Sequence, residues 1–206
     1  MAVLEWGNLN ERTYEYGVDR GVLQILGEDN LAWNGLISVD ETETNSSGIR
    51  SAFDGKVYAN LEFGGWYQAS VKSFGFPELA QHALGVVEVY PGLSVTAQNR
   101  LEFNFSYRTK VEDSFYKLHL VYNVLATGGD RSSSTVSENV NVEEYSWIFS
   151  TRPPSSDIFR PTSHLVINSK TADPSSLTVI EEWLYGEPLE DPFFPTQQQV
   201  IDQFAP

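Results

Sequence analysis

Alternation of apolar and polar residues is the dominant pattern along this chain. The clearest example is FYKLHLVYNV, residues 115–124. One face of this stretch carries Tyr116, Leu118, Leu120, Tyr122 and Val124, and the opposite face carries Lys117, His119 and Asn123. Because successive side chains of a strand point to opposite faces, this period of two predicts a half-buried β-strand.

The same alternation recurs through the chain and predicts further strands. They cover residues 66–74, 101–107, 144–151 and 163–168, with shorter strands over 21–26 and 36–39. Glycine and small polar residues separate the runs, as in GEDN from residue 27 and GGDRSSS from residue 128. The pattern therefore predicts a mainly β fold, either a twisted β-sandwich or an open barrel.

Only one segment has a clear helical pattern. In DPSSLTVIEEWLYG, Asp173 can cap the N-terminus, and Leu177, Ile180 and Leu184 share a face. Pro174 suits the first turn and Gly186 ends the helix, which is predicted over about 174–185. The remaining C-terminal residues, 192–206, are predicted to form a short helix or a docked tail beside a single domain of residues 1–191.

Two stretches between predicted strands are too long for tight turns. They cover residues 39–56 and 125–139 and are expected to be loops that contact other subunits, because long loops in compact domains are functional or mobile. The candidate contact residues in them are Asp40, Glu41, Glu43, Arg50, Asp54, Lys56, Asp130 and Arg131.

The stretch YGVDRGVL from residue 16 places an acid and a base side by side, Asp19 and Arg20, between two glycines. Neighbouring side chains in a strand or turn point apart, so a catalytic pair of these two residues is geometrically awkward. We expect a corner that leads into the first long strand. Each charge should pair across the sheet, hold a loop or contact another subunit.

Charge and composition narrow the function classes. The chain has 13 Lys and Arg residues against 28 Asp and Glu residues, a net charge of −15, which argues against a groove that grips nucleic-acid phosphates. No apolar run of about 18 residues and no signal-peptide pattern is present, so a soluble protein that is not exported is expected. The absence of cysteine excludes disulfides, cysteine–zinc sites and thiol nucleophiles.

No sequence motif of a known chemistry stands out. GIRSAFDGKV differs from a nucleotide-binding loop in its glycine spacing and lacks the hydroxyl residue after the lysine. The three histidines, His82, His119 and His164, lie in separate segments without the paired spacing of metal ligands. The histidines are therefore expected to be structural, with no catalytic residue, metal or cofactor.

A series of segments carries a family resemblance over nearly the whole chain. They are YGVDRGVL at 16, AWNGL at 32, SYRTK at 106, YKLHLVYN at 116, SWIFSTRPP at 146, PTSHLVINS at 161 and WLYG at 183. Taken in this order, they resemble the major tail proteins, or tail tube proteins, of long-tailed (siphovirus-type) bacteriophages, particularly those that infect actinobacteria.

The resemblance implies a structural virion protein without enzymatic activity or a cofactor. Such a protein joins identical copies, six to a ring, and stacked rings form the phage tail tube through which genome DNA is ejected. The implied partners are other copies of the chain and other tail proteins, namely the tape measure, the tail terminator and the distal tail protein. Assembly would occur in the cytoplasm of the host bacterium, and DNA would pass transiently through the lumen.

Two alternatives remain open at this point. The chain could be another virion component on a related fold, such as a minor tail, tail terminator or capsid decoration protein. It could also be a carbohydrate-binding β-sandwich for host attachment, which would present exposed Trp or Tyr side chains in a shallow patch.

Overall fold

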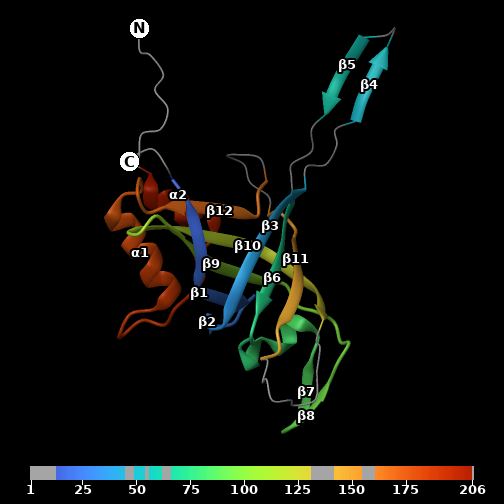
Figure 1. Ribbon diagram of the computed structural model, residues 1–206, viewed down its shortest axis with the longest axis vertical. Helices are drawn as coiled ribbons and strands as arrows, with labels where there is room; N and C mark the ends of the chain where they lie inside the picture. Colours follow the sequence, from blue (N-terminus) through green and yellow to red (C-terminus); the bar gives the residue numbers. More distant parts are fainter. Residues whose placement is uncertain are drawn as a thin grey trace.

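A computed structural model describes residues 13–44, 49–53, 56–61, 66–130, 142–154 and 161–205. Its main feature is an eight-stranded antiparallel sheet in the order β2-β1-β9-β10-β11-β6-β3, with β12 also paired to β10 (Figure 1). Its strands are β1 (Glu15–Ile25), β2 (Leu31–Trp33), β3 (Leu36–Thr44), β6 (Trp66–Ser73), β9 (Phe103–Val111), β10 (Phe115–Asp130), β11 (Tyr145–Thr151) and β12 (His164–Asn168). The predicted mainly β class is confirmed, and the large antiparallel sheet is consistent with a sandwich-like fold.

The sheet curls so that β3 approaches β1. A Cβ atom added to Gly21 in β1 would lie 2.5 Å from Leu36 Cδ1 in β3 and 2.9 Å from the backbone carbonyl oxygen of Trp33 in β2. The backbone contact is the one that requires glycine, because the Leu36 side chain could rotate away. The curled sheet encloses a first core of aromatic residues. Trp33 packs edge-on against Phe105 and Trp147, with ring centroids 5.5 Å and 5.6 Å apart.

A second core covers the outer face of the same sheet. Leu118, Leu120 and Tyr122 of β10 pack there with the helices α1 (Pro174–Tyr185) and α2 (Gln197–Phe204). Helix α1 begins and ends as predicted, since Asp173 accepts a hydrogen bond from the Ser176 amide and Gly186 follows the last turn. Phe194 and Val200, in the predicted C-terminal tail, are buried in this core.

Burial of β10 differs from the prediction of a half-buried strand. His119, Val121 and Val124 are buried inside the curled sheet, while Leu118 and Leu120 are buried under the helices. Val124 was predicted on the face of Leu118. It lies on the other face because the pairing of β10 with β9 shifts between Val121 and Val124, where Asn123 adopts a φ of 52°.

The two predicted long loops are largely strands. Residues 39–44 belong to β3, and the rest of the first stretch contributes β4 (Ile49–Phe53) and the first residue of β5 (Lys56–Leu61). In the second stretch, β10 continues to Asp130. Residues 45–48, 54–55 and 131–139 lie outside the described residues. The prediction failed in β3 because consecutive charged residues, Asp40 and Glu41, interrupt the apolar–polar alternation. In the extension of β10 it failed because Gly128 and Gly129 indicated a turn.

Several short elements escaped the sequence analysis. They are β2, β4, β5, the 3₁₀ helix η2 (Glu78–Leu84), β7 (Val87–Tyr90) and β8 (Leu93–Val95). The described chain therefore has three helices, where one helix and a C-terminal helix or tail were predicted. In the part of the chain that the structure describes, no helix is long and apolar enough to cross a membrane.

Two small hairpins lie apart from the main sheet. Strands β4 and β5 pair only with each other in the described chain, and so do β7 and β8. Figure 1 shows these two hairpins at opposite ends of the molecule along its longest axis. The eight-stranded sheet and its two cores lie between them.

Candidate functional site

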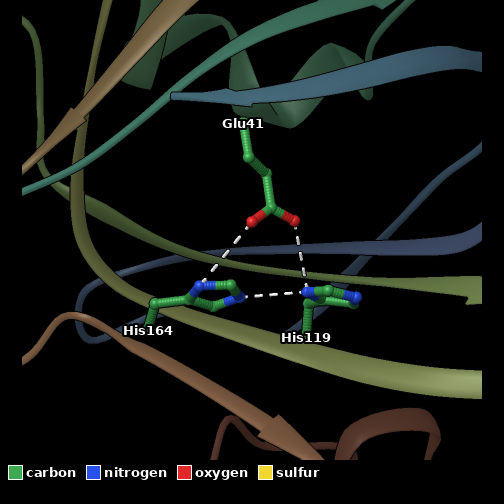
Figure 2. A group of neighbouring side chains, drawn as sticks. All are labelled: Glu41, His119 and His164. Atoms are coloured by element: carbon green, nitrogen blue, oxygen red, sulfur yellow. Dashed lines mark hydrogen bonds and ion pairs between the residues drawn. The ribbon is translucent and has the colours of Figure 1, made fainter. Parts of the chain in front are cut away.

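A cluster of polar side chains closes one end of the first core. Glu41 of β3, His119 of β10 and His164 of β12 point toward one another from three strands (Figure 2). One potential ligand atom from each residue lies within 4.8 Å of those of the other two. The three residues are 78 and 45 positions apart along the chain (41 to 119, and 119 to 164), so only the fold brings them together.

Strand register explains how the two histidines meet. In the antiparallel pair of β10 and β12, His119 lies opposite Val166, and Val121 lies opposite His164. His119 and His164 are therefore diagonal neighbours on one face of the sheet, a position from which long or aromatic side chains can touch. His119 Nδ1 and His164 Nε2 are 3.0 Å apart.

Glu41 arrives at the cluster through the alternation in β3. Val39 packs against the first core, and Glu41 follows two residues later on the same face, while Asp40 points to the exposed face. Glu41 Oε1 lies 3.4 Å from His119 Nδ1, and Oε2 lies 3.9 Å from His164 Nδ1.

Hydrogen bonds fix the proton positions in the cluster. Thr109 donates its single hydroxyl proton to Glu15 at 3.3 Å, so its oxygen accepts from His119 Nε2–H at 3.1 Å. The lone pair of His119 Nδ1 then faces His164. On the other side, Tyr107 donates to Glu41, and the Tyr67 hydroxyl, 3.1 Å from that of Tyr107, therefore donates to Tyr107.

Aromatic stacking holds the rings in place. The Tyr107 and His119 rings are stacked with centroids 4.4 Å apart and an interplanar angle of 10°. Burial lowers the pKa of His119 to about 3, with smaller contributions from His164 and Lys117, so this imidazole is neutral at neutral pH. Burial also raises the pKa of Tyr67 and Tyr107, which stay protonated donors.

The cluster corrects the sequence-based view of the histidines. His119 and His164 were expected to be unrelated structural residues, and no metal-ligand arrangement was expected. The structure pairs them with a carboxylate, so that one nitrogen of each imidazole and one carboxylate oxygen lie within 4.8 Å of one another. The sequence lacked any signal for this, because strand register decides the pairing.

Asp19 and Arg20 lie within β1 and not at a corner before it. The strand is irregular here, with register shifts on both sides of Asp19 and with Arg20 at a φ of 47°. Asp19 accepts two hydrogen bonds from Arg108 of β9, at 2.9 Å and 3.2 Å, which confirms a pairing across the sheet. The Arg20 guanidinium lies 5.2 Å from the ring centroid of Tyr185 in α1.

The remaining predicted contact residues are spread along the strands that lead to the β4–β5 hairpin and along the end of β10. Asp40 is exposed and accepts a hydrogen bond from Ser38 at 3.2 Å. By backbone position, Glu43 is in β3, Arg50 in β4, Lys56 in β5 and Asp130 in β10. Asp54 and Arg131 lie outside the described residues. Glu41 alone among the predicted residues belongs to the histidine cluster.

Comparison with known proteins gives no match: no protein-family model fits this chain, and no curated protein matches it.

We expect the Asp19–Arg108 pair to contribute to folding stability. Asp19→Ala should lower the free energy of unfolding by about 1–2 kcal/mol, because partly buried Arg108 loses two charge-assisted hydrogen bonds. Arg20→Ala should cost about 0.5–1 kcal/mol, the size of an exposed cation–π contact. Urea unfolding of dilute protein measures both. Asp40→Ala is the matched control, with an expected change below about 0.5 kcal/mol, and a loss at Asp19 no larger than that of the control would contradict the expectation.

Proposed function

We propose that this chain is a structural virion protein, a tail tube protein that assembles into stacked rings to form the conduit for DNA ejection. The observation that carries the proposal is the pair of hairpins at opposite ends of the molecule (Figure 1). A two-stranded hairpin by itself is at best marginally stable in water, so β4–β5 and β7–β8 each need a partner surface.

The β7–β8 hairpin has the surface of an element that is covered by a partner. Its exposed apolar side chains are Val89, Tyr90, Leu93 and Val95, which are between 44% and 67% exposed. Clustered apolar residues on a short hairpin are typical of protein contacts. A contact between this end of one copy and the opposite end of the next copy is head-to-tail, and head-to-tail contacts produce rings or open stacks.

Lateral contacts between copies can use the sheet. Helices α1 and α2 cover the outer face of β10 only along its first half. Farther along, Leu125 and Ile148 are exposed on the outer face of β10 and β11, at 36% and 45%. In the described chain, β3 and β2 end the strand order, and their outer edges can pair with a neighbour. These surfaces support assembly into a ring.

The negative charge suits passage of DNA. With 28 acidic residues against 13 basic residues, a lumen lined by this chain would repel phosphates and avoid the affinity that phosphate neutralisation provides. The same charge gives little support to a nucleic-acid binding protein.

The first test removes the β4–β5 hairpin. Thr44 and Trp66 are paired residues of β3 and β6, so an Asn-Gly turn in place of residues 45–65 can close these strands directly. We expect a folded variant that forms no tubes at concentrations where the parent chain does, as seen by light scattering and negative-stain electron microscopy. Tubes of normal width from this variant would argue against a role of the hairpin in assembly.

The parent chain in the same experiment separates the proposed function from its alternatives. Long tubes of uniform width support a tube protein. Single rings that never stack would indicate a tail terminator or a minor tail component. Persistent monomers would indicate a decoration protein or a carbohydrate-binding domain, and binding to a glycan array would separate the latter two.

A second test targets the opposite end of the molecule. The double variant Tyr90→Ser and Leu93→Ser removes apolar surface from the β7–β8 tip, and we expect an at least tenfold higher protein concentration for tube formation. Leu189→Ser is the matched control, because Leu189 is 98% exposed outside the hairpins. Sedimentation of assembled protein measures the threshold. An equal shift in both variants would contradict a specific contact.

A third test concerns the proposed acidic lumen. Assembled tubes mixed with linear double-stranded DNA should leave the DNA in the supernatant after sedimentation, both at low salt and near physiological salt. DNA that co-sediments at low salt and is released at high salt would indicate a basic binding surface and would overturn the acidic lumen.

A further inference from the structure

The Glu41, His119 and His164 cluster has the composition and shape of a metal centre. We propose that it binds one divalent transition-metal ion of the Zn²⁺ type per chain, through His119 Nδ1, one ring nitrogen of His164 and a carboxylate oxygen of Glu41. This inference depends on the arrangement of these side chains alone, and it holds whether or not the chain forms tubes.

The donor set indicates the class of ion. Two imidazole nitrogens and one carboxylate oxygen suit zinc and neighbouring first-row metals, and the same set of three protein ligands occurs in zinc sites that keep an open position. Mg²⁺ and Ca²⁺ prefer sites made of oxygen atoms, so they should bind poorly here.

The spacing of the donors fits a single small ion. Ligands at about 2.0–2.1 Å from a tetrahedral zinc ion lie about 3.3 Å from one another. His119 Nδ1 lies 3.0 Å from His164 Nε2 and 3.4 Å from Glu41 Oε1. The His164 Nδ1 to Glu41 Oε2 distance is 3.9 Å. These distances involve both ring nitrogens of His164 and both carboxylate oxygens of Glu41. One donor atom of each residue lies within 4.8 Å of those of the other two, so side-chain rotations that shorten the longest separation bring three donors around one ion.

Neighbouring side chains orient the ligands as metal sites require. Metal-ligating histidines usually donate their second ring N–H to an oxygen, which fixes the tautomer. His119 does so through Nε2–H to Thr109, at 3.1 Å, and this makes Nδ1, which faces His164 Nε2 in the metal-free protein, the nitrogen that would bind the ion. Tyr107 orients Glu41 in the same way, because its hydroxyl donates a hydrogen bond to the carboxylate.

The cluster is accessible from one side. The side chain of His119 is 6% exposed and that of His164 is 17% exposed, but that of Glu41 is 35% exposed. An ion can therefore enter past Glu41, and water can fill the remaining coordination position. The buried histidines supply the fixed part of the site.

The test uses the full chain without a histidine tag, stripped of metal with a chelator and titrated with Zn²⁺ in a calorimeter. We expect one ion per chain and an increase in melting temperature with Zn²⁺, because an ion that binds the folded state stabilises it. Mg²⁺ at the same concentration should give neither effect. Co²⁺ should produce visible absorption bands that Zn²⁺ abolishes by displacement.

Substitutions locate the ion. Glu41→Gln and His164→Gln are the ligand variants, because both positions are partly exposed and tolerate the change better than buried His119. Each should weaken Zn²⁺ binding by at least about tenfold. His82→Gln is the matched control, since His82 is exposed on η2, outside the cluster, and this variant should bind like the parent.

Thr109→Val tests the positioning residue. It keeps the side-chain shape and removes the oxygen that accepts from His119 Nε2–H. The melting temperature of the metal-free protein should fall, because a buried donor loses its partner, and Zn²⁺ affinity should fall about tenfold. Loss of metal-free stability with unchanged affinity would show a purely structural threonine.

Two results would overturn the metal site. One is a parent chain that binds no Zn²⁺ at millimolar concentration. The other is binding that Glu41→Gln and His164→Gln leave unchanged, which would place the ion elsewhere on the acidic surface. Neither result bears on tube formation, which is measured separately by microscopy.

Discussion

Burial of β10 on both faces is the constraint on which the rest of the structure depends. Its inward side chains, such as Val121 and Val124, belong to the aromatic core enclosed by the curled sheet. Its outward side chains, such as Leu118 and Leu120, belong to the core under α1 and α2. The shift of register at Asn123 allows one long strand to serve both cores and to pair first with β12 and then with β11. Both the helices and the sheet edges are placed by this strand.

Strand β10 and its neighbour β9 together form the polar end of the first core. Phe105, Tyr107 and Thr109 follow one another on the inward face of β9, so the interior changes from apolar to polar over four residues. His119 stacks on Tyr107 at the point of change. A buried imidazole with both nitrogens engaged costs little, because each polar atom has a partner. The arrangement is therefore compatible with a stable core in which the Nδ1 lone pair faces His164 Nε2.

Sequence reasoning succeeded where local physics decides the structure. All seven strands predicted from alternation exist, and α1 follows from Asp173, Pro174 and Gly186 with the predicted limits. It failed for the part of β3 beyond residue 39, where the charged residues Asp40 and Glu41 mask the period of two, and it failed for β4. The double burial of β10 was also missed, because alternation shows that two faces differ but not that both are covered.

The histidine cluster shows why site prediction is harder than fold prediction. No spacing along the chain relates Glu41, His119 and His164, since the register of β10 with β12 and the curl of the sheet bring them together. Asp19 was easier to interpret, because a charge in a strand is expected to find its partner on the neighbouring strand, and Arg108 is that partner.

The end hairpins and the histidine cluster lie in different parts of the molecule. Under the proposed function, contacts with other copies would use the two end hairpins and the uncovered half of the sheet, where Leu125 and Ile148 are exposed. The histidine cluster lies inside, where β3 crosses near β10 and β12. Because β3 continues from Glu41 to Thr44, whatever fixes Glu41 also fixes the end of β3 from which the chain continues to the β4–β5 hairpin.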